Sequence, residues 1–480
     1  MDKYDLAIIG GGPAGYHAAG LAASGGLKTI LFEADKLGGV CLNEGCIPTK
    51  AMLNASKHLY YARNAGAYGV MASYKSAGGA AAPENPEFRI NHEAVLARKE
   101  KVIRTLTAGV RSQLKSANAE VAAGKAEITG PAGAGGYIVT QSSGQEAGRA
   151  AEAARVLIAT GSSPVMPPLE GVAQGLASGF VITSTEALSL AKVPERFVII
   201  GGGIIGLELA DYYNSAGSQV TVVEMLDRIA YPMESETSRI LFNNLKKRGV
   251  NFMLGSRFTG IVQPGADGSG GGVTAEPASQ GIVPADKVLV AIGRRPNISG
   301  AGIERLGIYA ERGAIVTDDC MRTNVPGIYA AGDVNGKLML AHTAYREAEC
   351  AVSHMLGSPV RMRYDAIPSA VYTNPESAGA GETEESAAAK GLDVKVVKLP
   401  LRFSGRYIAE VDGGDGICKV IFDRRSGAVL GAHIVGPYAS EIIVSAAFMI
   451  ESKRPAKALR ELTFPHPTVG EALREAIFEF

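Results

Sequence analysis

The sequence predicts an α/β protein in which one strand–turn–helix–strand unit occurs twice and an α+β domain follows at the C-terminal end. Three observations support this prediction. The 480 residues correspond to about three domains at roughly 150 residues each. A glycine-rich turn follows an apolar run at two places, Gly10–Gly15 and Gly201–Gly206. Beyond Asp365, apolar residues alternate as they do in an antiparallel sheet.

The composition excludes several classes of protein. The 60 glycines show no G-x-y period, so the chain is not collagen-like. The 48 basic and 48 acidic side chains balance, which gives no reason to expect nucleic-acid binding or an anionic membrane surface. Five cysteines in so long a chain do not form a disulfide scaffold.

The first unit opens the chain. Tyr4–Ile9 is an apolar strand, a helix extends to about Ala23, and Leu27–Glu33 is a second strand. Gly10, Gly12 and Gly15 form the turn between the first strand and the helix. Such glycines allow a tight turn and close backbone approach to a pyrophosphate, and the helix N-terminus attracts the phosphate charge. The acid that ends the second strand suits a ribose.

The second unit repeats this pattern within Phe197–Glu224. Its glycines are Gly201, Gly203 and Gly206, and the distance from first glycine to acid is 23 residues in both copies (10 to 33 and 201 to 224). Two matched copies predict two Rossmann-like dinucleotide-binding domains. Glu224 favours NAD over NADP because a carboxylate repels a 2′-phosphate, although Arg228 is close in sequence.

The remaining elements follow from local pattern. We expect helices at 45–65, 91–117, 440–451 and 468–476, short strands within 121–160, strands at 288–291 and 328–330, and extended surface loops near 75, 135 and 270. The most apolar late run, Ile442–Ile450, has nine residues, whereas a bilayer needs about 20. The N-terminus has no secretory pattern, so we expect a cytoplasmic protein without a membrane span.

Cys41 and Cys46 are five residues apart, directly after the first unit. In a regular helix their Cα atoms would lie roughly 8 to 9 Å apart, beyond the usual disulfide limit of about 7 Å. A bond between them therefore needs a break in the helix, which Gly45 allows. A metal site is disfavoured because no further Cys or His lies close in sequence. By themselves the two cysteines fit buried structural thiols as well as a redox dithiol; their position after a dinucleotide unit favours the redox pair.

The run GGVCLNEGCIPTK (38–50) closely resembles the active-site segment of the flavin-dependent pyridine nucleotide–disulfide oxidoreductases, most of all the members that oxidise dihydrolipoyl groups. The similarity extends over the whole chain in the family's order, through ATGS (159–162), GGGIIGLE (201–208), AIGRRPN (291–297), YAAGD (329–333), LAH (340–342), YTNPE (372–376) and HPTVGE (466–471).

This resemblance implies a chemistry and its residues. A dihydrolipoyl dithiol would reduce a Cys41–Cys46 disulfide, and the electrons would pass through FAD to NAD⁺. Cys41 would form the mixed disulfide, and Cys46 would face the flavin. His466 would be the acid–base, oriented by Glu471, and would serve the active site of a second copy in a homodimer. Many relatives have a second histidine where this chain has Phe464. The resemblance therefore does not imply a proton relay that extends beyond His466 and Glu471.

The resemblance also implies the cofactor-binding residues. For FAD they are Gly10, Gly12, Gly15, Glu33, Lys50, Gly124, Thr160, Gly161, Ser162, Gly293, Asp333 and Ala341. For NAD they are Gly201, Gly203, Ile204, Gly206, Glu208 and Glu224, with Lys50 paired to Glu208 beside the flavin. Cys320, Cys350 and Cys418 carry no motif and are expected to be structural.

The predicted domains are an FAD-binding domain (1–164 and 288–356), an NAD-binding domain (165–287) and a C-terminal α+β dimerisation domain (357–480). The implied partners are the lipoyl domains of 2-oxoacid dehydrogenase complexes or the glycine-cleavage H protein. Alternatives are another disulfide reductase, of the glutathione or mercuric reductase kind, and a non-catalytic NAD-responsive flavoprotein. Glu224 disfavours the NADPH-dependent reductases, and the C-terminal end IFEF lacks the cysteine pair of mercuric reductases.

Overall fold

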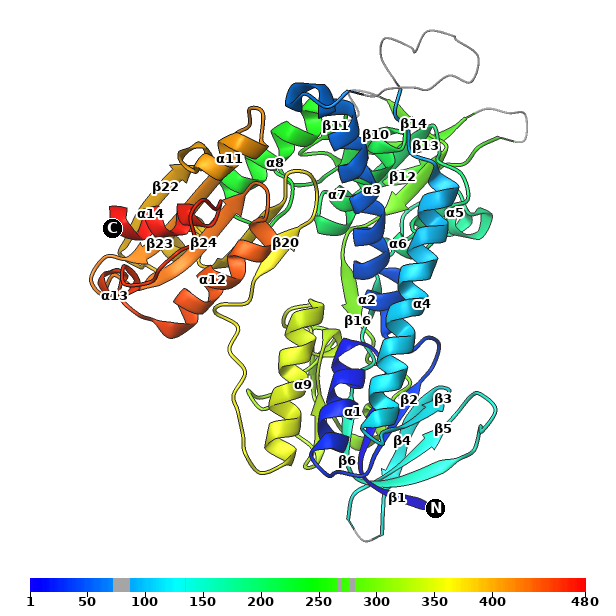
Figure 1. Cartoon of the computed structure of the whole chain (residues 1–480). Coiled ribbons are helices and arrows are strands. Elements are labelled where there is room, and N and C mark those ends of the chain that lie inside the picture. Colours follow the sequence, from blue (N-terminus) through cyan, green and yellow to red (C-terminus); the bar gives the residue numbers. More distant parts are fainter. Residues whose placement is uncertain (72–86, 134, 266–269, 277–280) are drawn as a thin grey trace, which may run out of the picture. The chain divides into compact units, whose positions relative to one another are not determined.

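A computed structural model describes residues 1–71, 87–133, 135–265, 270–276 and 281–480 (Figure 1). The chain forms two compact units. The first consists of Met1–Thr49, Ala97–Val165 and Gly293–Arg363, and the second of Lys50–Leu96, Met166–Ile292 and Tyr364–Phe480. Among the described helices, none has both the length and the apolarity that crossing a bilayer requires.

The first unit is built on a mainly parallel sheet in the order β3-β2-β1-β6-β5-β4, with β19 also paired to β6. Its strands are β1 (Asp2–Ile9), β2 (Thr29–Glu33), β3 (Glu120–Ala123), β4 (Ala126–Pro131), β5 (Tyr137–Gln141), β6 (Ala150–Ile158) and β19 (Ile328–Ala330). The second half of β1 (residues 6–9) and most of β2 are buried apolar runs, as expected for strands covered on both faces. The helices α1 (Pro13–Ser24) and α9 (Ala341–Met355) pack against each other (Figure 1).

The second unit contains a parallel sheet in the order β11-β10-β9-β15-β8. Its strands are β8 (Val181–Ile182), β9 (Arg196–Ile200), β10 (Gln219–Val223), β11 (Asn251–Met253) and β15 (Lys287–Val290). The helices α7 (Ile204–Ser215) and α8 (Ser235–Lys247) belong to this part of the unit. The strand order places β9 and β10, with α7 between them in sequence, at the centre of the sheet, which reproduces the first unit's β1–α1–β2 arrangement.

An antiparallel sheet, β12 (Arg257–Val262), β13 (Gly271–Glu276) and β14 (Ile282–Ala285), lies within the same unit. The prediction of a surface loop near 270 is therefore wrong for residues 271–276, which form β13. A β-carbon on Gly271 would lie 2.6 Å from the Phe180 ring, so this glycine permits close packing of a strand. The glycines near 135 belong to the short connection between β4 and β5, and the loop expected near 75 lies outside the described residues.

The C-terminal part of the second unit is an antiparallel sheet in the order β20-β21-β24-β23-β22. Its strands are β20 (Ser369–Val371), β21 (Ser377–Gly381), β22 (Val394–Pro400), β23 (Ile417–Asp423) and β24 (Val429–Val435), with helices α10 (Glu384–Ala389), α11 (Gly405–Glu410), α12 (Ala439–Ser452), α13 (Ala456–Leu459) and α14 (Glu471–Glu479). α12 packs on β21 and β24, and α14 packs on β22 and β23. α14 begins three residues later than predicted.

The other elements are α2 (Gly39–Glu44), α3 (Cys46–Asn64), η1 (Ala65–Tyr68), α4 (His92–Ser116), β7 (Ser162–Pro164), α5 (Val172–Ser178), α6 (Ser184–Ala187), β16 (Arg294–Pro296), η2 (Glu304–Leu306), β17 (Ala310–Glu311), β18 (Ala314–Ile315), η3 (Asp333–Asn335) and η4 (Leu401–Phe403). The predicted fold class, two Rossmann-like parts and an α+β C-terminal domain, is confirmed.

Candidate active site

The first glycine turn leaves no room for a side chain at its first and third glycines. Gly10 has φ +108°, and a β-carbon there would lie 2.2 Å from the Ala159 carbonyl oxygen. A β-carbon on Gly15 would lie 1.8 Å from the Gly10 carbonyl oxygen. Strand, turn and helix therefore meet at backbone distance, which lets a bound pyrophosphate reach the start of α1.

The same turn presents a carboxylate beside a helix N-terminus. Glu33 Oε2 accepts a hydrogen bond from the Gly11 amide at 2.6 Å, and its Oε1 accepts one from the Asp35 amide at 2.7 Å. Gly12 is the N-cap of α1 and has no side chain with which to cap it. The first amides of α1 are thus left for a ligand, and the helix dipole favours an anionic one.

The second glycine turn has the same geometry. Gly201 has φ +108°, and a β-carbon on Gly206 would lie 2.2 Å from the Gly201 carbonyl oxygen. Glu224 Oε2 accepts from the Gly202 amide at 2.6 Å, and its Oε1 accepts from the Leu226 amide at 2.8 Å. Gly203 is the N-cap residue of α7 but has no side chain with which to cap it, and Ile204 is the first residue of the helix. Both turns therefore fit a dinucleotide by the same two criteria: a backbone cradle that a Cβ would fill and an uncapped helix start.

The other predicted FAD residues of the first unit form a connected group. Thr160 Oγ1 donates to the Asn297 carbonyl at 2.6 Å, and the Asn297 amide nitrogen donates to the Gly161 carbonyl at 2.9 Å. Ser162 Oγ donates to Asp333 Oδ2 at 2.5 Å. Gly293 precedes β16, which pairs antiparallel with β7.

Two further predicted positions, Ala341 and Gly124, are placed by the backbone. Ala341 is the first residue of α9. Gly124 has φ +155°, and its amide donates to the Glu33 carbonyl at 2.7 Å, so that hydrogen is already used within the protein. Gly332, just before Asp333, donates its amide to the fully buried Glu347 at 2.6 Å.

Sequence reasoning missed Arg294. Its Nε donates to Ser162 Oγ at 2.7 Å, and it lies 4.0 Å from Asp333. Burial lowers the pKa of this guanidinium, and Asp333 and Cys46 oppose that shift. Arg294 was within a recognised motif, but a motif of this kind does not show which of its side chains points inward.

The cysteine segment contains the predicted break. α2 ends at Glu44, Gly45 leaves helical geometry with φ −148° and ψ −106°, and α3 begins at Cys46. A β-carbon on Gly45 would lie 3.1 Å from the Val40 carbonyl oxygen, which makes glycine the best fit at this bend. Both cysteines are half-buried. Cys46 is thus at the start of a 19-residue helix, where a thiolate is stabilised.

Two tyrosines near the cysteine segment were also missed. The hydroxyls of Tyr16 on α1 and Tyr345 on α9 are hydrogen-bonded to each other. Burial raises the pKa of both phenols, and the charges of Cys41 and Cys46 raise it further. These hydroxyls therefore stay protonated and belong to the electrostatic surroundings of the two sulfur atoms. No motif marks Tyr345, so only the packing of α1 on α9 shows it.

In the second unit, Lys50 and Glu208 form the ion pair that the resemblance implies. Lys50 Nζ donates to both carboxylate oxygens of Glu208 at 3.0 Å, and Glu208 is buried. Glu208 Oε1 also accepts from the Tyr372 amide at 3.0 Å, and the Lys50 ammonium lies 4.4 Å from the centre of the Tyr372 ring. The pair connects α3, α7 and the segment after β20.

His466 and Glu471 also meet in the second unit. His466 Nδ1 lies 2.9 Å from Glu471 Oε1, while Glu471 Oε2 accepts from the Thr468 amide at 2.8 Å. That amide, followed by His466, lowers the pKa of Glu471. The imidazole is held at one nitrogen but is 79% exposed, so its other nitrogen is open to a molecule that docks here.

The comparisons with known proteins decide the family. A family model described as "Pyridine nucleotide-disulphide oxidoreductase" matches residues 4–348, and the dimerisation-domain model of the same family matches residues 367–477. The chain belongs to the pyridine nucleotide-disulphide oxidoreductase family. The prediction of this family is confirmed, as are FAD and NAD, the cofactors of the family, and a dimerisation domain that supports a homodimer.

Members of this family resemble the chain along its full length. A protein named dihydrolipoyl dehydrogenase 3, from Pseudomonas putida, is 38% identical and aligns with 99% of this chain and 98% of its own. The dihydrolipoyl dehydrogenase of Bacillus subtilis is 36% identical, with 99% and 97% covered. Among solved structures, LpdA from Mycobacterium tuberculosis has a TM-score of 0.86 at 28% identity, covering 100% of this chain and 99% of that one. The Cu(II) complex of the HOCl-induced flavoprotein disulfide reductase RclA from Escherichia coli has a TM-score of 0.84 at 27% identity, covering 100% of both chains.

Proposed function

We propose that this chain is a dihydrolipoyl dehydrogenase, which oxidises dihydrolipoyl groups to lipoyl groups with NAD⁺. The observation that carries the proposal is the full-length similarity to proteins of that name. It is supported by the cysteine segment, in which the chain leaves helical geometry at Gly45 and Cys46 begins the next helix. The two matched glycine turns supply a cradle for each of two dinucleotides.

In the proposed reaction, a substrate thiolate attacks Cys41 of the Cys41–Cys46 disulfide and releases Cys46 as a thiolate. The second substrate thiol then displaces Cys41, so the substrate leaves as a disulfide and the protein holds both electrons as a dithiol. His466 of a second copy of the chain takes the proton from the attacking thiol, and Glu471 of that same copy holds the imidazole in position for this step. FAD, when bound, supplies the electron transfer from this dithiol to NAD⁺.

The proposed cofactor contacts divide between the two units. Gly10, Gly12, Gly15 and Glu33 would hold the adenosine and pyrophosphate of FAD, and Gly201, Gly203, Gly206 and Glu224 would do the same for NAD. The rest of the FAD set is Lys50, Gly124, Thr160, Gly161, Ser162, Gly293, Asp333 and Ala341; Ile204 and Glu208 complete the NAD set. We also propose the domain boundaries 164/165, 287/288 and 356/357, lipoyl domains as partners, and the cytoplasm as the compartment.

The test is the steady-state oxidation of dihydrolipoamide with NAD⁺ by the wild type and by Cys46→Ser. We expect turnover in the wild type and none in the variant, with a normal flavin spectrum in both. Cys320→Ser is the matched control, because Cys320 is a buried cysteine outside the proposed site. An active Cys46→Ser enzyme, or a wild type that bleaches with NADH but has no dithiol activity, would contradict the proposal.

A further inference from the structure

Arg228 lies in the segment that borders the ribose-binding carboxylate proposed above. The segment after β10 is tied to the second glycine turn at both ends: the Leu226 amide donates to Glu224, and the Ala230 amide donates to the Gly202 carbonyl at 2.7 Å. Arg228 is at the middle of this short segment. An arginine at such a place is the group that usually binds the 2′-phosphate of NADP.

The guanidinium of Arg228 is held by a carboxylate from the C-terminal part of the unit. Its Nη1 and Nη2 donate to Glu385 Oε1 and Oε2 at 2.5 and 2.7 Å. Arginine binds phosphate with the same bidentate geometry. The Glu385 carboxylate and a phosphate therefore cannot occupy the Arg228 guanidinium in this way at the same time. The hydrogen bonds between the two groups raise the pKa of Arg228 and lower that of Glu385, as expected for a pair that stays ionised.

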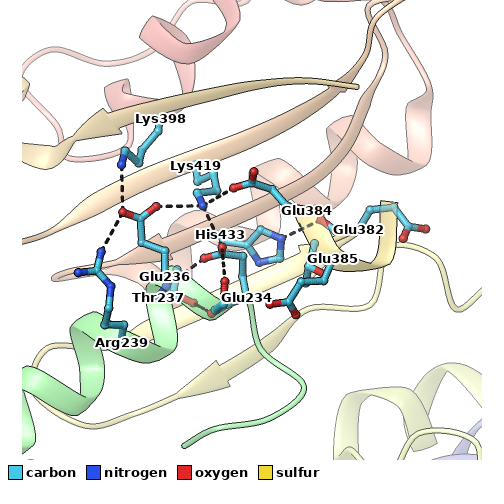
Figure 2. A network of polar contacts seen from close by, with 12 residues as sticks. Glu234, Glu236, Thr237, Arg239, Glu382, Glu384, Glu385, Lys398, Lys419 and His433 are labelled. Atoms are coloured by element: carbon cyan, nitrogen blue, oxygen red, sulfur yellow. Dashed lines mark hydrogen bonds and ion pairs between the residues drawn. The ribbon is translucent and has the colours of Figure 1, made fainter. Parts of the chain in front are cut away.

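The helix that carries Glu385 is anchored by a charge network around the buried Lys419 (Figure 2). Its neighbour on α10, Glu384, accepts from Lys419 Nζ at 2.5 Å. The same ammonium donates to Glu234 at 2.8 Å and lies 3.0 Å from Glu236, at the start of α8. The side chains of Lys419 and Glu234 are 4% and 2% exposed. α10 is therefore anchored to β23 and to the start of α8, which follows the Arg228 segment in the chain.

From this arrangement we infer that Glu385 is a specificity-determining residue: it occupies the Arg228 guanidinium and so withholds it from the 2′-phosphate of NADP. Discrimination against NADP then has two sources in this chain. Glu224 repels the 2′-phosphate directly, and Glu385 removes the one nearby cation of the segment that could offset this repulsion. The inference rests on the proposed NAD site, and it assigns to the dimerisation domain a part in coenzyme choice.

The first test measures binding, without the dithiol substrate. Dissociation constants for 2′,5′-ADP and for 5′-AMP are measured by isothermal titration calorimetry on the flavin-loaded enzyme. Glu385→Ala should lower the dissociation constant of 2′,5′-ADP by roughly tenfold, which is the effect of a newly available charged hydrogen bond. The dissociation constant of 5′-AMP should stay unchanged. Unchanged 2′,5′-ADP affinity in a variant that still binds 5′-AMP would overturn the inference.

The matched control is Arg228→Ala/Glu385→Ala, which loses the same carboxylate but also the guanidinium. It should show no gain for 2′,5′-ADP; an equal gain there would mean that the carboxylate acts through its charge alone, which also overturns the inference. If Glu385→Ala does not fold, Glu385→Gln, which keeps the side-chain size, serves in its place. In turnover, the NADP⁺ to NAD⁺ ratio of kcat/KM should rise by a similar factor. Because binding is read without dithiol, a failure of the proposed activity would leave this result interpretable.

Discussion

The buried ammonium of Lys419 offers the strongest test of how the C-terminal sheet is held to the start of α8 (Figure 2). Lys419→Met keeps much of the side-chain volume but leaves Glu234, whose side chain is 2% exposed, without its charge partner. Removing one member of a buried ion pair costs about 3 to 5 kcal/mol, whereas the half-exposed Glu384 contributes about 0 to 1 kcal/mol. We therefore expect a loss of about 4 kcal/mol in local stability.

The assay is native-state hydrogen exchange of the β23 amides at pH 7, which reports the free energy of opening in this part of the chain. A loss of about 4 kcal/mol corresponds to exchange faster by roughly 10³-fold in the variant. Lys419→Met/Glu234→Gln removes the uncompensated charge and should recover most of this loss. A change of less than tenfold in the single variant, or a double variant no better than the single one, would refute the reasoning.

The network also predicts a pH dependence. Although burial alone would raise the pKa of Glu234, the hydrogen bonds from Lys419 and the backbone amides lower it. Burial alone would lower the pKa of Lys419, but the hydrogen bonds to its three carboxylate partners raise it. The contribution of Glu234 is present above its unfolded pKa and is lost as the pH falls through the lowered value. That of Lys419 is present below its unfolded pKa and is lost only as the pH rises through the raised value. The protection of the β23 amides against hydrogen exchange should therefore stay constant between about pH 6 and 9. It should decline at lower pH, as Glu234 becomes protonated.

Three further substitutions test the proposed site. His466→Gln should lower dihydrolipoamide turnover by roughly 10²-fold or more with normal flavin content, because it removes the acid–base but no cofactor contact; loss of flavin instead would indicate a structural role. Gly206→Ala places a β-carbon 2.2 Å from the Gly201 carbonyl oxygen, so NADH binding should be lost while flavin is retained, as followed by fluorescence titration and the flavin spectrum. Gly15→Ala should do the reverse and yield protein without flavin; flavin-loaded Gly15→Ala would contradict the close packing described for that turn.

Local pattern was sufficient wherever backbone geometry restricts residue choice. The first and third glycines of each triplet could be predicted because only glycine fits where a β-carbon would lie about 2 Å from a carbonyl oxygen. Gly12 and Gly203 have room for a β-carbon, and they and the two acids follow instead from the fixed spacing of the motif. The break at Gly45 could also be predicted, since a regular helix holds residues five apart too far from each other for a disulfide. The loop expected near 270 was wrong because glycines that permit close packing of β13 resemble glycines of a turn.

The sequence by itself determined the fold class, the two dinucleotide turns, the cysteine pair and the His466–Glu471 couple, because each depends on residues close in the chain or on a motif of fixed spacing. Only the tertiary structure showed that Arg294 lies beside Ser162, that Tyr16 meets Tyr345, and that Glu385 occupies Arg228. These partners are more than a hundred residues apart. Such contacts depend on how helices and strands pack, and side-chain charge alone does not indicate which distant partner a residue will meet.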